Sequence, residues 1–309
     1  MTSLVRLAGV ELGGTKTIVV LAGEGTVIEQ RTITTTTPAE TLERARESLT
    51  AWNSEKPLSA LGIASFGPLQ LNRNSPDFGR MYDTPKPGWS GTDVAGALSS
   101  DLACPCTIDT DVNGAALAEY CWGAGQGHSS LWYITVGTGV GGGLLIDGRP
   151  VHGAMHPEIG HIRVRRPAGD GFTGVCPFHG DCIEGLVSGP ALGARFGCDP
   201  EAISDADPGW NDVAADLAEL VATLLLTTAA TAILFGGSVI TNRPFLLPLI
   251  NRRTLARLSG YLPAVDTRSI DEIVRLASLG EDAGPRGALA LADQARQERA
   301  ARSERRVRR

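Results

Sequence analysis

Two stretches of this chain repeat one order of strand, glycine/threonine turn and strand, and the repetition narrows the possible folds. The first hairpin spans residues 7–22 with its turn at 13–16, and the second spans residues 131–147 with its turn at 137–143. Short apolar runs on either side of a glycine-containing turn are typical of β-hairpins. One such hairpin heading each half of the chain predicts an internal duplication. A ligand would then lie in a cleft between two similar domains, with both turns facing it.

Both turns carry residue types that suit an anion. A Gly-Gly-Thr-Lys turn can expose backbone N–H groups and adds a hydroxyl and an ammonium group. An ordinary hairpin with a solvated Lys16 explains the first turn equally well. In the second hairpin the run Gly139–Gly143 is more flexible than a connection requires, which favours a phosphate-facing loop over a plain turn.

A cluster of cysteines and histidines follows the second hairpin. Cys176, His179 and Cys182 are separated by two residues each, and His161 stands upstream. Two thiolates and two imidazoles suit a tetrahedral, structural Zn²⁺ with no open position. The alternative is a pair of buried cysteines and two unrelated surface histidines, but Gly, Pro and Asp crowd the loop and offer little apolar core. A disulfide between Cys176 and Cys182 fits less well still, because the start of the chain lacks a signal-peptide pattern.

Composition limits the class of protein and its partners. The 309 residues are enough for two domains, each with its own core. The net charge of −6 argues against a nucleic-acid partner. No apolar run reaches the roughly 18 residues that span a bilayer, so no membrane partner is expected and the cytoplasm is the expected compartment. There the remaining cysteines would be free thiols.

Local patterns place several further elements. Pro38–Trp52 is predicted to be an amphipathic helix that begins with a capping box at Thr37. The Pro/Gly-rich loop at 71–91 is long enough to be functional. Asp111 lies between a strand and a helix, where a lone aspartate caps the helix more often than it enters a cleft. A strand at 268–278 and a helix at 284–295 are expected near the C-terminus.

Taken together, these motifs resemble the ROK family (repressor, open reading frame, kinase), and within it the bacterial fructokinases. The resemblance covers roughly residues 6–293. The stretches that carry it are Glu11–Lys16, Ser65–Pro68, Thr84–Trp89, Asp109–Asn113, Thr135–Gly139, His156–His161, Cys176–Gly185 and Gly236-Gly237.

The resemblance implies an α/β, actin-like (hexokinase/ribonuclease H-like) duplicated two-domain fold with an interdomain cleft. The N-terminal domain would comprise residues 1–112, completed by a C-terminal helix at 284–296. The C-terminal domain would comprise residues 113–283, with an inserted zinc loop at 156–185. Residues 297–309 would form a flexible basic tail. A homodimer is expected by analogy.

The implied activity is ATP-dependent phosphorylation of D-fructose at the 6-hydroxyl, with Mg²⁺ accompanying ATP. The resemblance makes Asp111 the base, which outweighs its reading as a helix cap. Whether Glu11 is an outer-shell partner of Mg²⁺ stays open from the sequence. The sugar would be bound by Asp111, Glu158, His161 and Glu184. The zinc ligands would be His161, Cys176, His179 and Cys182. ATP would be bound by Gly13, Gly14, Thr15, Lys16, Gly137, Thr138, Gly139, Pro190, Gly236, Gly237 and Ser238.

Some local residues depart from the family pattern, and other functions stay open. His179 stands where most members have a third cysteine, a form found in the fructokinase-like branch, and Ser238 replaces a third glycine. Within the same class, a kinase for glucose, mannose or an N-acetylhexosamine is the alternative. A non-catalytic sugar sensor is disfavoured by the presence of Asp111, Lys16 and both glycine/threonine turns. A repressor is disfavoured because only about a dozen residues precede the first turn.

Overall fold

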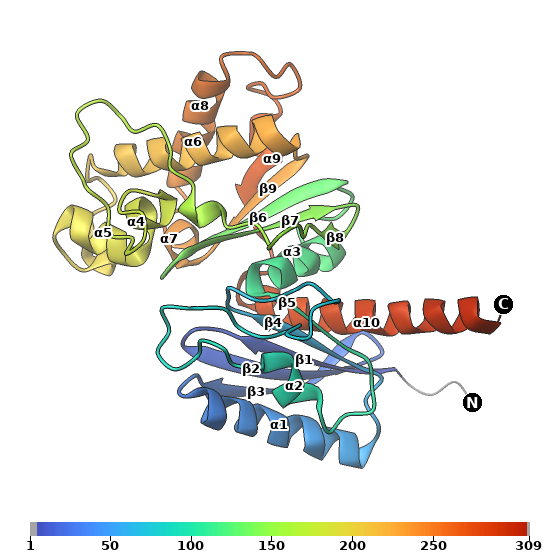
Figure 1. The fold of residues 1–309 in the computed structure, drawn as a ribbon. Helices are drawn as coiled ribbons and strands as arrows, with labels where there is room; N and C mark the ends of the chain where they lie inside the picture. The colour runs from blue at the N-terminus through green and yellow to red at the C-terminus, as the bar shows by residue number, and fades with distance from the viewer. Residues whose placement is uncertain (1–4, 308–309) are drawn as a thin grey trace. The chain divides into compact units, whose positions relative to one another are not determined.

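The structure, a computed structural model, describes residues 5–307 and divides into two compact units (Figure 1). Unit 1 comprises the chain up to Cys121, the short segment His152–His156 and the chain from Glu281 onward. Unit 2 comprises Trp122–Val151 and Pro157–Gly280. Each unit therefore collects pieces that are distant in the sequence.

Unit 1 is built on a five-stranded sheet of order β3-β2-β1-β4-β5. β1 pairs antiparallel with β2 through the first glycine/threonine turn and parallel with β4, and β4 pairs parallel with β5. All six residues of β4 are buried, as expected for a central strand covered on both faces. The strands are β1 (Arg6–Leu12), β2 (Lys16–Gly23), β3 (Thr26–Thr34), β4 (Ala60–Ser65) and β5 (Cys106–Thr110).

Helices cover both faces of this sheet. α10 runs along one face and α1 along the other (Figure 1). On the α10 face the paired residues Gly9 and Gly62 stand on neighbouring strands, and a side chain at Gly62 would collide with the α10 backbone. α1 begins at the predicted cap, where Thr37 accepts the Glu40 N–H. The helices are α1 (Pro38–Glu55), α2 (Val94–Ser99), α3 (Asp111–Trp122) and α10 (Ala283–Val307).

The sheet of unit 2 repeats the order and strand directions of the first. Its order is β10-β9-β6-β7-β8, with β6 antiparallel to β7 through the second glycine/threonine turn and parallel to β9. The duplication inferred from the two hairpins is therefore visible in the topology. The strands are β6 (Ser130–Val136), β7 (Val140–Ile146), β8 (Arg149–Pro150), β9 (Ala232–Gly236) and β10 (Val274–Leu276).

The long apolar helix α6 organises the rest of unit 2. It packs against α8 and α4, and twelve of its nineteen residues are buried. The remaining elements are η1 (Ile159–His161), α4 (Ile183–Val187), α5 (Gly189–Phe196), η2 (Pro200–Ala202), α6 (Trp210–Thr228), α7 (Ser238–Thr241), α8 (Leu246–Leu258), α9 (Ile270–Ile273) and η3 (Gly280–Asp282), the last at the boundary with unit 1.

A buried ion-pair network fastens the residues before the cysteine loop to this helical layer. The Arg195 guanidinium lies 2.5 Å from Asp170 and 2.8 Å from Asp216, and these three side chains are at most 7% exposed. Arg166 adds a second cation on Asp170. Burial raises the pKa of Asp216 while the Arg195 hydrogen bond opposes that rise.

Three local expectations differ from the structure. The strand expected at 268–278 is only β10, because the preceding residues form α9. The C-terminal helix continues through Val307, since Ala, Arg, Gln and Glu are strong helix formers, and only 308–309 of the expected tail lie outside the described residues. No element was predicted for residues 246–258, which form α8 with Pro248 in its first turn. No helix within residues 5–307 is both long and apolar enough to cross a bilayer.

Candidate functional site

Asp111 is the first residue of α3, directly after the carboxyl end of β5. The Thr110 hydroxyl accepts the Asn113 N–H at 3.2 Å and so caps the helix, which leaves the Asp111 carboxylate without the capping role. Asp111 instead accepts the neighbouring Val112 N–H at 2.8 Å. Burial raises the pKa of Asp111 to about 6, against the lowering effect of these N–H groups. A carboxylate that is ionised at neutral pH but close to its pKa suits proton transfer.

Glu11 places a second carboxylate close to Asp111 in unit 1. Its carboxylate packs against Gly284, where any side chain would collide with it. Within residues 5–307, Glu11 Oε2 is buried without a hydrogen-bond partner. Burial and the charge of Asp111 raise the pKa of Glu11 to about 7, while Lys16 opposes the rise. A buried carboxylate oxygen lacking a donor, next to another carboxylate, fits a divalent cation such as Mg²⁺.

The first glycine/threonine turn is held at its base and open at its tip. The Gly13 N–H donates to the Lys16 carbonyl at 3.0 Å, and the Thr35 hydroxyl donates to the Gly13 carbonyl at 2.9 Å. Lys86, from the long loop, donates to the Gly14 carbonyl. Gly14, Thr15 and Lys16 are exposed. The tip therefore exposes a hydroxyl and an ammonium group that can reach an anion, and the Lys16 ammonium lies 3.9 Å from Glu281 Oε2.

The second turn lies beside two other segments expected to bind ATP. The Gly137 carbonyl accepts the Gly189 N–H at 2.7 Å, next to Pro190 at the start of α5. Gly237 has φ of 83° and sits so close to Val136 that a side chain there would meet its backbone. The residues expected here thus belong to neighbouring loops in unit 2. There are seven of them: Gly137, Thr138, Gly139, Pro190, Gly236, Gly237 and Ser238.

Glu184 connects the cysteine loop to the second turn. Its Oε2 accepts the Val140 N–H at 3.0 Å, and a methyl group on Gly139 would lie 2.8 Å from the same oxygen. On the other side of Val140, Gly160 packs against the Val140 carbonyl so closely that no side chain fits. Gly160 belongs to the 3₁₀ turn η1, which ends at His161 and follows directly after Glu158. The three residues expected in unit 2 to bind the sugar therefore sit on segments that both pack against Val140.

The four expected metal ligands lie together, with all ligand atoms within 4.8 Å of one another. His161 Nδ1 is 3.8 Å from Cys176 Sγ and 3.6 Å from Cys182 Sγ, and His179 Nδ1 is 3.8 Å from Cys176 Sγ. Bond lengths of about 2.3 Å to sulfur and 2.0–2.1 Å to nitrogen around a tetrahedral Zn²⁺ require S···N separations of about 3.6 Å. Burial raises the pKa of the Cys182 thiol, so a thiolate there needs a cation. The cluster fits zinc.

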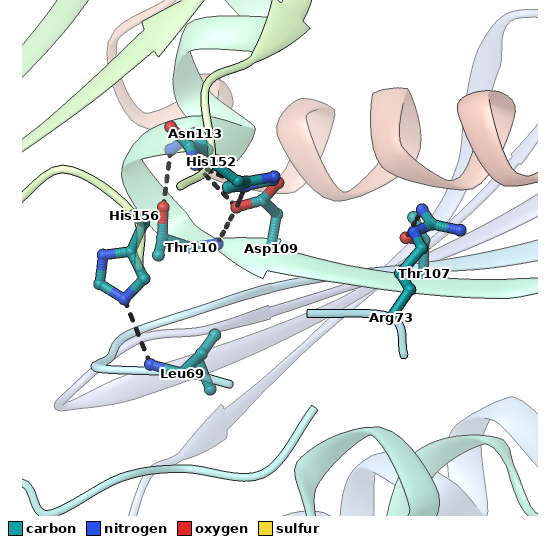
Figure 2. A network of polar contacts seen from close by, with 8 residues as sticks. All are labelled: Leu69, Arg73, Thr107, Asp109, Thr110, Asn113, His152 and His156. Carbon is teal, nitrogen blue, oxygen red and sulfur yellow. Dashed lines mark hydrogen bonds and ion pairs between the residues drawn. The ribbon is translucent and has the colours of Figure 1, made fainter. Parts of the chain in front are cut away.

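One polar group near Asp111 had no role in the expectations from sequence. His152, from the segment His152–His156, forms an ion pair with the buried Asp109 in the strand that precedes Asp111 (Figure 2). The only sequence signal was its spacing of four residues from His156. That spacing carries no information on a partner 43 residues earlier.

Comparisons with known proteins agree with the motifs. The ROK family matches residues 7–295. A fructokinase from Zymomonas mobilis subsp. mobilis is 41% identical, covering 92% of this chain and 95% of the relative, and a fructokinase from Pediococcus pentosaceus is 37% identical, covering 94% and 98%. A ROK family glucokinase from Streptomyces griseus, solved with glucose and AMPPNP, superimposes with a TM-score of 0.70 at 26% identity, covering 94% of this chain and 100% of that chain. The predicted α/β fold class is confirmed.

Proposed function

Because this chain belongs to the ROK family, we propose that it is an ATP-dependent fructokinase, which phosphorylates D-fructose at the 6-hydroxyl to give fructose 6-phosphate and ADP. The observation that carries the proposal is identity of 41% and 37% to two fructokinases over more than nine-tenths of every chain. The Streptomyces griseus glucokinase shares the fold at only 26% identity, which favours fructose over glucose.

Asp111 acts as the general base. Its carboxylate accepts the proton of the sugar hydroxyl while the hydroxyl oxygen forms a bond to the γ-phosphorus and the bond to the ADP oxygen breaks. The raised pKa of Asp111, about 6, leaves the carboxylate ionised at pH 7 yet basic enough to accept that proton. Thr110 supports this role, since its hydroxyl caps α3 and relieves Asp111 of that task.

The glycine/threonine turns contact the phosphates of ATP. In unit 1 the exposed tip Gly14–Lys16 offers N–H groups, a hydroxyl and an ammonium group. In unit 2 Gly137–Gly139 contributes N–H groups, and Gly236–Ser238 with Pro190 lies along the adenosine. Glu11 would help to hold Mg²⁺, which would supply neutralisation of the charge on the phosphate oxygens of ATP.

Sugar recognition falls to Glu158, His161 and Glu184, together with Asp111. Carboxylates pair with neighbouring sugar hydroxyls and reject analogues that lack them. His161 faces the cysteine sulfurs with Nδ1, so Nε2 is the ring nitrogen that remains for a sugar hydroxyl. A structural Zn²⁺ held by the Cys176–Cys182 loop would fix the angle of this ring.

The test is a panel of fructose, glucose, mannose and N-acetylhexosamines with ATP and Mg²⁺, scored by kcat/KM from the release of ADP. Fructose should give the highest kcat/KM, and its product should be the 6-phosphate. A higher kcat/KM for another hexose would make the protein a kinase for that hexose. The absence of ADP release with every sugar would favour a sugar sensor. We also propose that the protein is cytoplasmic and forms a homodimer. Sedimentation at several protein concentrations would test the homodimer.

A further inference from the structure

The segment His152–His156 is the only part of the chain between Trp122 and Gly280 that joins unit 1. Its two histidines bond near the carboxyl ends of two neighbouring parallel strands (Figure 2). His156, which is buried, accepts the Leu69 N–H on Nε2 at 3.2 Å, just after β4. His152 places Nε2 3.0 Å from Asp109 Oδ2 on β5. The segment therefore spans the edge of the sheet from which α3 begins.

Asp109 gathers three donors around one buried carboxylate. Besides His152, the Asn113 side-chain amide donates to Asp109 Oδ1 at 2.7 Å and the Thr110 N–H donates to the same oxygen at 2.8 Å. Asp109 is 4% exposed and Asn113 is fully buried. A buried carboxylate is costly unless donors and a cation surround it. When protonated, the His152 imidazole supplies this charge, since its Nε2 lies 3.0 Å from Asp109 Oδ2.

These contacts enclose the backbone that carries Asp111. Asp109 precedes Asp111 by two residues and Asn113 follows it by two. The hydrogen bond between their side chains therefore links the residues on either side of Asp111. The capping hydrogen bond from the Asn113 N–H to the Thr110 hydroxyl is a second link across the same turn. The direction of the Asp111 carboxylate therefore depends on a backbone turn that the Asp109 carboxylate holds together.

We propose that His152 is a positioning residue for Asp111, which acts through the Asp109–Asn113 bridge by supplying the donor and the charge that keep the Asp109 carboxylate in place. The inference rests on the proposed function, because it takes Asp111 as the base. His152 does not touch the substrate in this role. Its loss should lower turnover, since a small displacement of the Asp111 carboxylate weakens its hydrogen bond to the reacting sugar hydroxyl.

The hydrogen on His152 follows from its partners. The Asp109 carboxylate can only accept a hydrogen bond, so Nε2 of His152 carries the hydrogen. A protonated Nε2 cannot accept from the Asn113 side-chain amide, whose Nδ2 lies 3.5 Å away. The hydrogen bond to Asp109 raises the pKa of His152, while burial and the charge of Arg73 oppose the rise. The positively charged form therefore dominates at low pH. As the pH rises through this raised pKa, His152 still donates a hydrogen bond to Asp109 but loses its positive charge.

The test compares His152→Ala, which removes donor and charge, with His152→Gln, which keeps a neutral donor. We expect kcat to fall by roughly tenfold or more in His152→Ala and by less in His152→Gln, with the KM for the sugar within about threefold of wild type. The advantage of wild type over His152→Gln should be largest below pH 6.5 and shrink at higher pH. His128→Gln, at a half-buried histidine of unit 2, is the matched control and should keep wild-type kcat.

Hydrogen exchange supplies a readout that does not need activity. Amides of residues 110–113 should exchange faster in His152→Ala, while those of β1 in the same unit keep wild-type protection. Unchanged exchange at 110–113, or a kcat within twofold of wild type, would overturn the positioning role. Absence of sugar phosphorylation by the wild-type protein would instead refute the proposed function, and the exchange measurement would still decide whether His152 holds this turn.

Discussion

Asp111→Asn should lower turnover and raise the stability of the fold at pH 7. The substitution removes the charge but keeps an oxygen that can accept the Val112 N–H. Because the folded environment raises the pKa of Asp111 from 3.8 to about 6, protonation of this group favours the folded state. That contribution is complete below about pH 3.8 and is lost as the pH rises through 6. At pH 7 the ionised carboxylate therefore destabilises unit 1.

The size of this effect follows from the shift in pKa. A rise of about two units corresponds to about 3 kcal/mol at 1.36 kcal/mol per unit. Partial exposure of the carboxylate reduces the effect, so we expect Asp111→Asn to gain about 1–3 kcal/mol of unfolding free energy at pH 7 and little at pH 4. A gain of this size would raise Tm by a few degrees for a unit of this size.

Turnover should change in the opposite sense. Loss of the base should lower kcat by a factor on the order of 10²–10⁴ with the sugar still bound. In the wild-type protein, a base with a pKa of about 6 is about 91% ionised at pH 7 and about 9% at pH 5, so kcat/KM should fall about tenfold between those values.

The assay is coupled ADP release between pH 5 and 8, with thermal unfolding of the same samples. Asp147→Asn is the control, because Asp147 is exposed in a left-handed turn that asparagine also accepts. Near-normal turnover of Asp111→Asn would rule out Asp111 as the base. A variant less stable than wild type at pH 7 would refute the argument from burial.

Three other substitutions test the metal loop, the second turn and the buried charges. Gly139→Ala should raise the KM for ATP about tenfold or more by displacing the carboxylate that holds the Val140 N–H, whereas Gly171→Ala, with open space around it, should not; equal KM values would contradict this contact. Cys182→Ser should lose bound zinc by metal analysis and weaken sugar affinity and thermal stability together, and unchanged sugar affinity in zinc-free protein would refute the coupling through the metal loop. Arg195→Met should cost about 3–5 kcal/mol in denaturant unfolding, because the buried Asp216 loses its ion-pair partner and Asp170 keeps only Arg166. A cost below about 1 kcal/mol would contradict that account.

The parts of the molecule that sequence predicted are those governed by short-range rules. The hairpin around Gly13–Lys16 follows from apolar runs and glycines, and the start of α1 follows from a capping box. The metal ligands share one loop apart from His161, so their spacing already limited the geometry. The repetition of one hairpin predicted the internal duplication, which the two sheets show, whereas the fold class was implied by the resemblance to the ROK family.

The parts that sequence missed depend on partners far apart in the chain. Thr110 rather than Asp111 caps α3, and both residue types are good caps, so only the backbone geometry decides between them. His152 gains its partner Asp109 because the chain returns to unit 1 for five residues, which no local pattern records. Glu184 stays a predicted sugar ligand, but its hydrogen bond from the Val140 N–H could not be predicted, because that bond depends on how the metal loop packs on β7.

The helix α10 has a consequence for synthesis on the ribosome. The first sheet is translated early, but the face formed by β1, β4 and β5 has no cover until the last residues of the chain emerge. Gly9 and Gly62 carry no side chain, so the backbone and small side chains of α10 pack closely against these two strands. The amino-terminal half must therefore wait, incompletely packed, while the unit encoded in the middle of the gene has everything it needs to fold first. In a nascent chain, unit 1 can therefore be completed only after α10 has been translated, whereas the residues of unit 2 have all been translated earlier.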